Sequence, residues 1–163
     1  MLFFLSKSLE NALYVNNRDS HTDNWYITET GIVVALDCEN TRLVPQTHDL
    51  ALLLNFSTHF TERQKDAYLE KYIKEFNTIN KEKITDPTIF KLEYYNSMLH
   101  KAFTLFCSWQ QRPSRKEQTQ HVLHNGRIAL TRLKEEMPSY YTRHRHAYEH
   151  LDFSLGRLMM QHP

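Results

Sequence analysis

A polar loop followed by a predicted β-hairpin occupies residues 17–39, which read NRDSHTDNWYITETGIVVALDCE. Two short runs, residues 25–28 and 32–36, are rich in the β-branched and aromatic side chains that favour strands. Gly31 lies in the segment between them and can adopt the positive φ that a tight turn requires. The pattern therefore predicts one antiparallel hairpin immediately after the polar loop.

The open end of this hairpin gathers oxygen-bearing side chains. If the turn is at Thr30-Gly31, antiparallel pairing continues down the strands until Asn24 faces Asp37. Amide and carboxylate oxygens that converge in this way are ligands of the kind that Mg²⁺ prefers. Asp19 lies in the loop that leads to the same end, and its carboxylate is available to orient a hydroxyl nucleophile. The hairpin thus predicts a metal site next to a third carboxylate.

The rest of the chain reads as helix, apart from the loop and the hairpin. A four-residue spacing of apolar side chains predicts a helix at the start, and helix-capping patterns predict several helices in the second part. These patterns begin at Asp49, Thr61–Gln64, Asp86-Pro87, Ser114–Glu117 and Ser139. We therefore expect one predominantly helical α+β domain over residues 1–163, with a helix at 1–15, a loop at 16–24, the hairpin at 25–37 and a helical region at 46–163.

Composition excludes several classes of protein. Only three glycines are present, at positions 31, 126 and 156, so neither a Walker A loop nor a G-x-G-x-x-G loop exists in these 163 residues. No apolar run reaches the length of a membrane span, and the only cysteines are Cys38 and Cys107. Two cysteines are too few for a disulfide framework. We expect a cytoplasmic protein that does not bind a membrane.

Charge and histidine clusters give weaker signals. Residues 1–60 carry a net charge of −4 and residues 111–163 a net charge of +4, but basic and acidic side chains alternate in the second region. This alternation is typical of solvated helix faces and does not predict nucleic-acid binding. His146 and His150 have the i, i+4 spacing of zinc ligands without an obvious third ligand, so exposed helix histidines are the favoured interpretation. Cys107 is expected to be a small buried apolar residue.

The order of the loop, the hairpin and the following helix resembles a known family. It is similar to the catalytic and metal-binding loops of the protein-kinase-like fold, and specifically to the aminoglycoside phosphotransferase and choline kinase superfamily. In that superfamily the catalytic loop commonly reads H-G-D-x-H-x-x-N, the metal loop reads I-D-W-E, and D-L-A opens an apolar helix. The corresponding segments here are residues 17–24 (NRDSHTDN), 36–39 (LDCE) and 49–51 (DLA).

The resemblance implies a role for each matching residue. Asp19 would be the catalytic base that positions the acceptor hydroxyl, and Asn24 and Asp37 would hold Mg²⁺ on the phosphates of ATP. His21 and Asp49 would support the catalytic loop. The implied reaction is ATP- and Mg²⁺-dependent phosphotransfer to a hydroxyl of a small molecule, namely a sugar, an aminoglycoside or an amino alcohol.

Two departures from the family pattern change what is expected. Asn17 stands where the family usually has histidine, and the resemblance covers only the C-terminal lobe of such a kinase. The nucleotide-binding residues of the N-terminal lobe have no counterpart here, so we expect a truncated or partner-completed lobe that is inactive alone. The alternative is a catalytically inactive remnant that binds a protein. In either case, a homodimer or a partner protein is expected to cover the apolar residues 2–5 with Trp25 and Tyr26.

Overall fold

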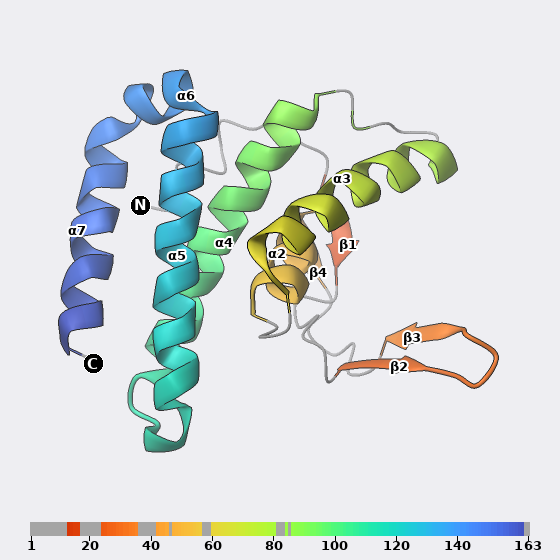
Figure 1. The fold of residues 1–163 in the computed structure, drawn as a ribbon, viewed down its shortest axis with the longest axis horizontal. Coiled ribbons are helices and arrows are strands. Elements are labelled where there is room, and N and C mark those ends of the chain that lie inside the picture. Colours follow the sequence, from red (N-terminus) through yellow and green to blue (C-terminus); the bar gives the residue numbers. More distant parts are fainter. Residues whose placement is uncertain are drawn as a thin grey trace. The chain divides into compact units, whose positions relative to one another are not determined.

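The chain is predominantly helical, with two short antiparallel strand pairs in its first third (Figure 1). This confirms the predicted helix-rich α+β class. The computed structural model describes residues 13–16, 24–35, 42–45, 47–56, 60–80, 84 and 86–161. The elements in chain order are β1 (Leu13–Asn16), β2 (Trp25–Ile27), β3 (Val33–Ala35), β4 (Arg42–Pro45), α2 (Thr47–Asn55), α3 (Glu62–Ile79), α4 (Pro87–Trp109), the 3₁₀ turn η2 (Pro113–Arg115), α5 (Lys116–Glu136), α6 (Pro138–Arg143) and α7 (Arg145–Gln161).

The chain divides into two compact units, and the single domain expected over residues 1–163 stays a prediction. One unit covers Asn11–Glu93 and contains the four strands with α2, α3 and the beginning of α4. The other is built mainly from Tyr94–Pro163, and the boundary falls inside α4. All the predicted site residues belong to the first unit.

The last residues of the predicted first helix form a strand instead. β1 pairs antiparallel with β4, and the ladder ends with Asn16 opposite Arg42. β1 contains an aromatic and a β-branched residue, Tyr14 and Val15, which favour extended backbone when a partner strand is present. The prediction of a helix through residue 15 is therefore wrong at this point. The earlier part of that predicted helix lies outside the described residues.

The predicted hairpin is present, and Gly31 has the expected positive φ of 79°. The amide of Thr28 donates to the carbonyl of Ile32, and the amide of Gly31 donates to the carbonyl of Thr28, both at 2.9 Å. These bonds close a three-residue loop, whereas the sequence predicts a turn with two central residues. The predicted register is therefore wrong by one residue, since Trp25 faces Ala35.

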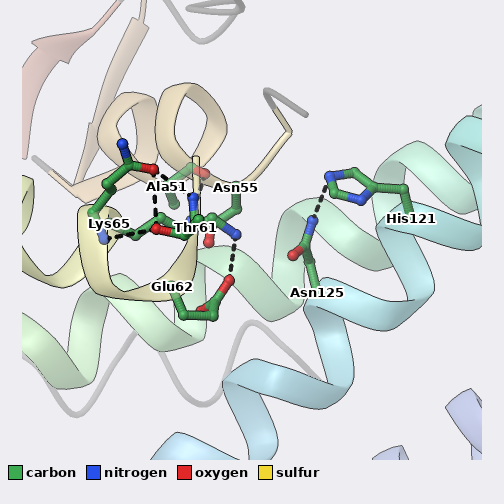
Figure 2. Close-up of polar contacts among 8 residues, drawn as sticks. Ala51, Asn55, Thr61, Glu62, Lys65, His121 and Asn125 are labelled. Atoms are coloured by element: carbon green, nitrogen blue, oxygen red, sulfur yellow. Dashed lines mark hydrogen bonds and ion pairs between the residues drawn. The ribbon is translucent and has the colours of Figure 1, made fainter. Parts of the chain in front are cut away.

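Both helices that follow the strands are predicted from the sequence, and α3 also begins as its side-chain chemistry predicts. α2 is an apolar helix that starts two residues before Asp49, at Thr47. α3 begins with the predicted capping box (Figure 2). The amide of Gln64 donates to Oγ1 of Thr61 at 3.3 Å, and the amide of Thr61 donates to Oε1 of Gln64 at 2.9 Å. Both bonds satisfy amide groups that a helix N-terminus otherwise leaves unpaired.

Replacing Thr61 with alanine is expected to lower the free energy of unfolding by about 1 kcal/mol, because the amide of Gln64 loses its acceptor. Urea denaturation with an unchanged m-value would measure this loss. Thr61→Ser keeps the hydroxyl and is the matched control, with an expected change of no more than a few tenths of a kcal/mol in either direction. Equal losses for the two variants would show that the methyl group, and not the cap, stabilises this end of α3.

The N-terminus of α4 also matches its prediction. Pro87 is the first residue of the helix, and Oδ1 of Asp86 accepts from the amides of Thr88 at 2.8 Å and Ile89 at 3.3 Å. Proline is favoured at this position because its nitrogen has no hydrogen to leave unpaired. The acidic cap followed by proline thus marks the start of α4 correctly.

The predicted start of α5 is wrong. The sequence predicts a capping box between Ser114 and Glu117, but α5 begins at Lys116 after a 3₁₀ turn, and Arg115 precedes it without a side-chain cap. The amide of Arg115 donates to the carbonyl of Arg112 at 2.9 Å. This turn places Ser114 inside the 3₁₀ segment, where it cannot cap α5. The single last helix predicted after Ser139 is likewise divided into α6 and α7.

The core of the second unit is formed by α4, α5 and α7. Tyr94, Tyr95 and Phe106 of α4 are each 3% exposed, and Trp109 is half-buried. Cys107 is exposed, so the prediction that it is buried is wrong. It follows Phe106 by about 100° around the helix, which turns its side chain away from the core face. None of the described helices is long and apolar enough to cross a membrane.

Candidate functional site

The segments that carry the predicted catalytic and metal-binding residues lie between two nested pairs of strands. β2 and β3 pair with each other, and they lie in the chain between β1 and β4, which also pair. The connection from Asn16 to Trp25 and the connection from Ala35 to Arg42 therefore start and finish at the same two pairs of facing residues. Facing residues in an antiparallel ladder have Cα atoms about 4.5–5.5 Å apart. The two connections are thus held next to each other at both ends.

These connections contain the residues that the resemblance singles out. The first carries Asp19, His21 and Asn24, and the second carries Asp37 two residues after β3 ends. Asp19, His21 and Asp37 lie outside the described residues. Asn24 is described, and it is buried, with 9% of its surface exposed, immediately before the first residue of β2.

The hairpin register corrects one part of the predicted metal geometry. Placing Asn24 directly opposite Asp37 requires Trp25 to face residue 36, whereas Trp25 faces Ala35. A shift of one residue in an antiparallel pair moves a side chain to the other face of the sheet. Regular hairpin pairing alone therefore does not bring Asn24 and Asp37 together. The distance between their oxygen atoms stays a prediction, since Asp37 lies outside the described part of the chain.

Asp49 is in the first turn of α2, where the D-L-A pattern predicts it. Its side chain is half-buried, whereas the supporting role predicts full burial. The catalytic-loop backbone that it is expected to bind, near Asp19, lies outside the described residues. Two apolar neighbours on the same helix, Ala51 and Leu52, are 0% and 4% exposed, so the helix itself is firmly packed.

Three buried polar residues on α2 were not anticipated from the sequence. Thr47, His48 and Asn55 are 0%, 6% and 1% exposed. The side-chain amide of Asn55 donates to the carbonyl of Ala51 at 2.9 Å, as Figure 2 shows. The only signal was a polar Thr-His pair just before Asp49, at the start of the predicted helical region. Buried polar groups need hydrogen-bond partners, so these side chains constrain the structure around α2.

Lys65 on α3 is a buried cation that sequence analysis also missed. It is 5% exposed, and its Nζ lies 2.6 Å from Oε1 of Glu62, one turn earlier (Figure 2). The side chain of Glu62 is 42% exposed, so the pair lies at the boundary between core and solvent. Because its charge is already matched by Glu62, Lys65 stabilises the first turns of α3 and is a poor candidate for a phosphate ligand.

A shallow hollow on the second unit offers no better site. It has a volume of about 250 Å³, and every described residue that lines it comes from α5: His124, Arg127, Ile128, Thr131, Arg132 and Glu135. Nε of Arg127 lies 3.7 Å from a carboxylate oxygen of Asp152, and Arg132 forms a 2.9 Å ion pair with Glu136. Both guanidinium groups have carboxylate partners of their own, which weakens any attraction for an anion.

Across the residues that the structure describes, no group of three or more His, Cys, Asp or Glu side chains is arranged to hold a metal ion. His146 and His150 on α7 therefore have no third ligand in that part of the chain. Comparison with family models, curated proteins and solved structures finds no match for this chain. Support for a function comes from the residue pattern and the strand topology.

Proposed function

We propose that residues 17–24 and 36–39 form the catalytic and metal-binding loops of an ATP- and Mg²⁺-dependent phosphotransferase that acts on a hydroxyl group of a small molecule. The observation that carries this proposal is the nesting of the two strand pairs. Asp19, Asn24 and Asp37 all fall within the two connections whose end residues are paired in this nesting. Three residues that only form turns would not be expected to fall within two connections whose ends are paired in this way.

The residues divide the chemistry among them. Asp19 orients the acceptor hydroxyl and takes up its proton, as a carboxylate does in general-base catalysis. Asn24 and Asp37 offer an amide oxygen and a carboxylate oxygen, a donor set that fits Mg²⁺, and His21 and Asp49 position the catalytic loop. When bound, Mg²⁺ neutralises charge on the nucleotide phosphates. The acceptor class is a sugar, an aminoglycoside or an amino alcohol.

The burial of Asn24 supports a role beyond turn formation. An amide side chain that only terminates a loop loses nothing by staying in water, whereas transfer of an amide out of water costs free energy unless its hydrogen bonds are replaced. Asn24 is 9% exposed although the residues that follow it in β2 are exposed. Its position is thus fixed by its surroundings, as a metal ligand requires.

A catalytically inactive kinase-like module that binds another protein is the second candidate. It is favoured by the glycine content, because three isolated glycines cannot form a loop that covers nucleotide phosphates. It is also favoured by the exposed apolar residues Trp25 and Tyr26 of β2, which are 36% and 55% exposed. An active enzyme needs the nucleotide-covering part from another polypeptide or from sequence outside these 163 residues.

Calorimetric titration of ATP into the chain distinguishes the two candidates. We expect weak binding that requires Mg²⁺ and disappears with EDTA, because the metal links the nucleotide phosphates to Asn24 and Asp37. Asp37→Asn and Asn24→Ala should each weaken binding by about tenfold or more, which corresponds to about 1.4 kcal/mol. Weak affinity is expected because only part of the phosphate-binding machinery is present.

Asp152→Asn is the matched control for this titration. It makes the same change of charge on α7, where the side chain of Asp152 is 55% exposed, and it should bind nucleotide like the unmodified chain. Circular dichroism must show that every variant remains folded. Nucleotide binding that does not require Mg²⁺, or an unchanged affinity of Asp37→Asn for the nucleotide, contradicts the phosphotransferase proposal. A folded chain that binds no nucleotide supports the inactive module instead.

A further inference from the structure

Two buried polar atoms in the second unit have no hydrogen-bond partner among the described residues. They are Nδ2 of Asn96 on α4 and the hydroxyl oxygen of Tyr140 on α6. A buried amide or hydroxyl group that makes no hydrogen bond costs free energy. In folded proteins nearly all such groups are therefore bonded either to protein or to ordered water. The two atoms thus indicate a polar ligand inside this unit.

Both atoms lie near one hydroxyl group, that of Tyr148 on α7. Tyr148 is 0% exposed, and its hydroxyl donates to Oδ1 of Asn96 at 3.0 Å. Nδ2 belongs to the same carboxamide group of Asn96, so it lies beside this hydroxyl. The ring centroids of Tyr140 and Tyr148 are 6.4 Å apart. Burial raises the pKa of Tyr148 and the Tyr140 hydroxyl raises it further, because the two hydroxyl groups are close together. Three helices therefore bring three polar side chains to one buried point.

The donors and acceptors at this point match one water molecule. Nδ2 of Asn96 and the hydroxyl of Tyr140 can both donate, and the oxygen of Tyr148 can accept because its own hydrogen goes to Asn96. Water accepts two hydrogen bonds and donates two, so one molecule satisfies all three groups. Exchanging the two atoms of the Asn96 amide changes only the direction of these bonds, since water donates as well as accepts. Buried waters typically make about three hydrogen bonds, as this one would.

The three side chains at this point are neutral, so they do not offset the free-energy cost of burying an ion, and water is the ligand that fits. We propose that Asn96, Tyr140 and Tyr148 bind one buried water molecule that joins α4, α6 and α7. α6 has only six residues, none of which is buried as a whole, and a helix of this length is not stable alone (Figure 1). The hydrogen bond from Tyr140 to the water anchors α6 to the two longer helices. The proposal does not depend on the phosphotransfer site.

Replacing Tyr140 with phenylalanine tests the proposal by the sign of its effect on stability. With the water in place, the variant loses a hydrogen bond, and the equilibrium constant for unfolding should rise about fivefold. Without the water, phenylalanine removes a buried hydroxyl that has no partner, and the protein should become more stable. Urea denaturation with an unchanged m-value measures the difference. The backbone amides of α6 should also exchange with deuterium faster in the variant, because α6 has lost its anchor.

Tyr141→Phe is the matched control, because it removes the hydroxyl of the next residue of α6, which is half-buried. It should change the unfolding constant by less than about twofold. A high-resolution crystal structure of the unmodified chain should show a water within about 2.7–3.2 Å of Nδ2 of Asn96 and of the hydroxyl oxygens of Tyr140 and Tyr148. The proposal is overturned if Tyr140→Phe is at least as stable as the unmodified chain or if both variants lose stability equally. A direct hydrogen bond between the Tyr140 and Tyr148 hydroxyl groups, with no water beside them, would overturn it as well.

Discussion

Replacing Tyr148 with alanine should lower the free energy of unfolding by about 4 kcal/mol. Tyr148 on α7 is 0% exposed, and its ring stacks on Tyr141 with 5.2 Å between the ring centroids. Its hydroxyl donates to Oδ1 of Asn96 on α4 at 3.0 Å. Alanine removes the ring contacts, leaves a cavity and deprives Asn96 of a donor. Urea denaturation measures the loss, and a change below about 1 kcal/mol would show that Tyr148 is not packed as the structure has it.

The variant Tyr148→Phe separates the contribution of the hydroxyl to stability from that of the ring. It should cost about 1–2 kcal/mol at neutral pH, because one buried hydrogen bond is lost and the ring remains. Burial raises the pKa of Tyr148 above its ordinary value of 10.0, and the neighbouring Tyr140 adds to the effect. The unfolded chain therefore loses this proton above pH 10.0 while the folded chain keeps it, so stability falls as pH rises.

This pH dependence provides a second readout for Tyr148. Between about pH 8 and pH 11, the stability advantage of the unmodified protein over Tyr148→Phe should shrink, with a slope of up to about 1.4 kcal/mol per pH unit above pH 10. The other tyrosines are present in both proteins and cancel in the difference. A constant difference across this range would mean that the Tyr148 hydroxyl ionises as easily in the folded chain as in the unfolded one.

Helix starts were predictable where a side chain and a nearby amide decide them. The capping box at Thr61 and the acidic cap at Asp86 depend on residues within three positions of each other, so the sequence contains the whole interaction. The same kind of pattern failed at Ser114. There a competing local bond from the amide of Arg115 to the carbonyl of Arg112 forms a 3₁₀ turn. A capping box and a 3₁₀ turn are both locally possible at such a point, and the residue pattern alone does not show which of them is more stable.

Strand pairing was predictable only in part. Gly31 indicates a tight turn, but loops of two and three residues both use a glycine with positive φ, so the glycine does not determine the register. The pairing of β1 with β4 is even harder to predict from the sequence, because Asn16 and Arg42 are far apart along the chain and neither residue indicates the other as its partner. The order of the candidate site residues was visible in the sequence. The ladder that bounds their segments was not, because it depends on this long-range pairing.

Replacing Gly126 with leucine should lower the free energy of unfolding by about 3 kcal/mol or more. Gly126 is buried in α5, and a Cβ atom there would lie 3.1 Å from Cβ of Ala102 on α4. It would also lie 3.3 Å and 3.4 Å from the two δ carbons of Leu155 on α7. Ala102 cannot yield without moving its backbone, so a larger side chain must push the helices of this unit apart.

The matched control is Gly156→Leu on α7, where a Cβ atom would meet nothing within 4 Å. Leucine is a much better helix former than glycine, so this variant should gain about 0.5–1 kcal/mol. The same substitution in two helices of one unit is thus expected to change stability in opposite directions, because helix propensity acts alone at Gly156 and steric overlap outweighs it at Gly126. Urea denaturation of both variants gives the comparison, and a stable Gly126→Leu protein would show that α4, α5 and α7 do not pack as closely as the structure has them.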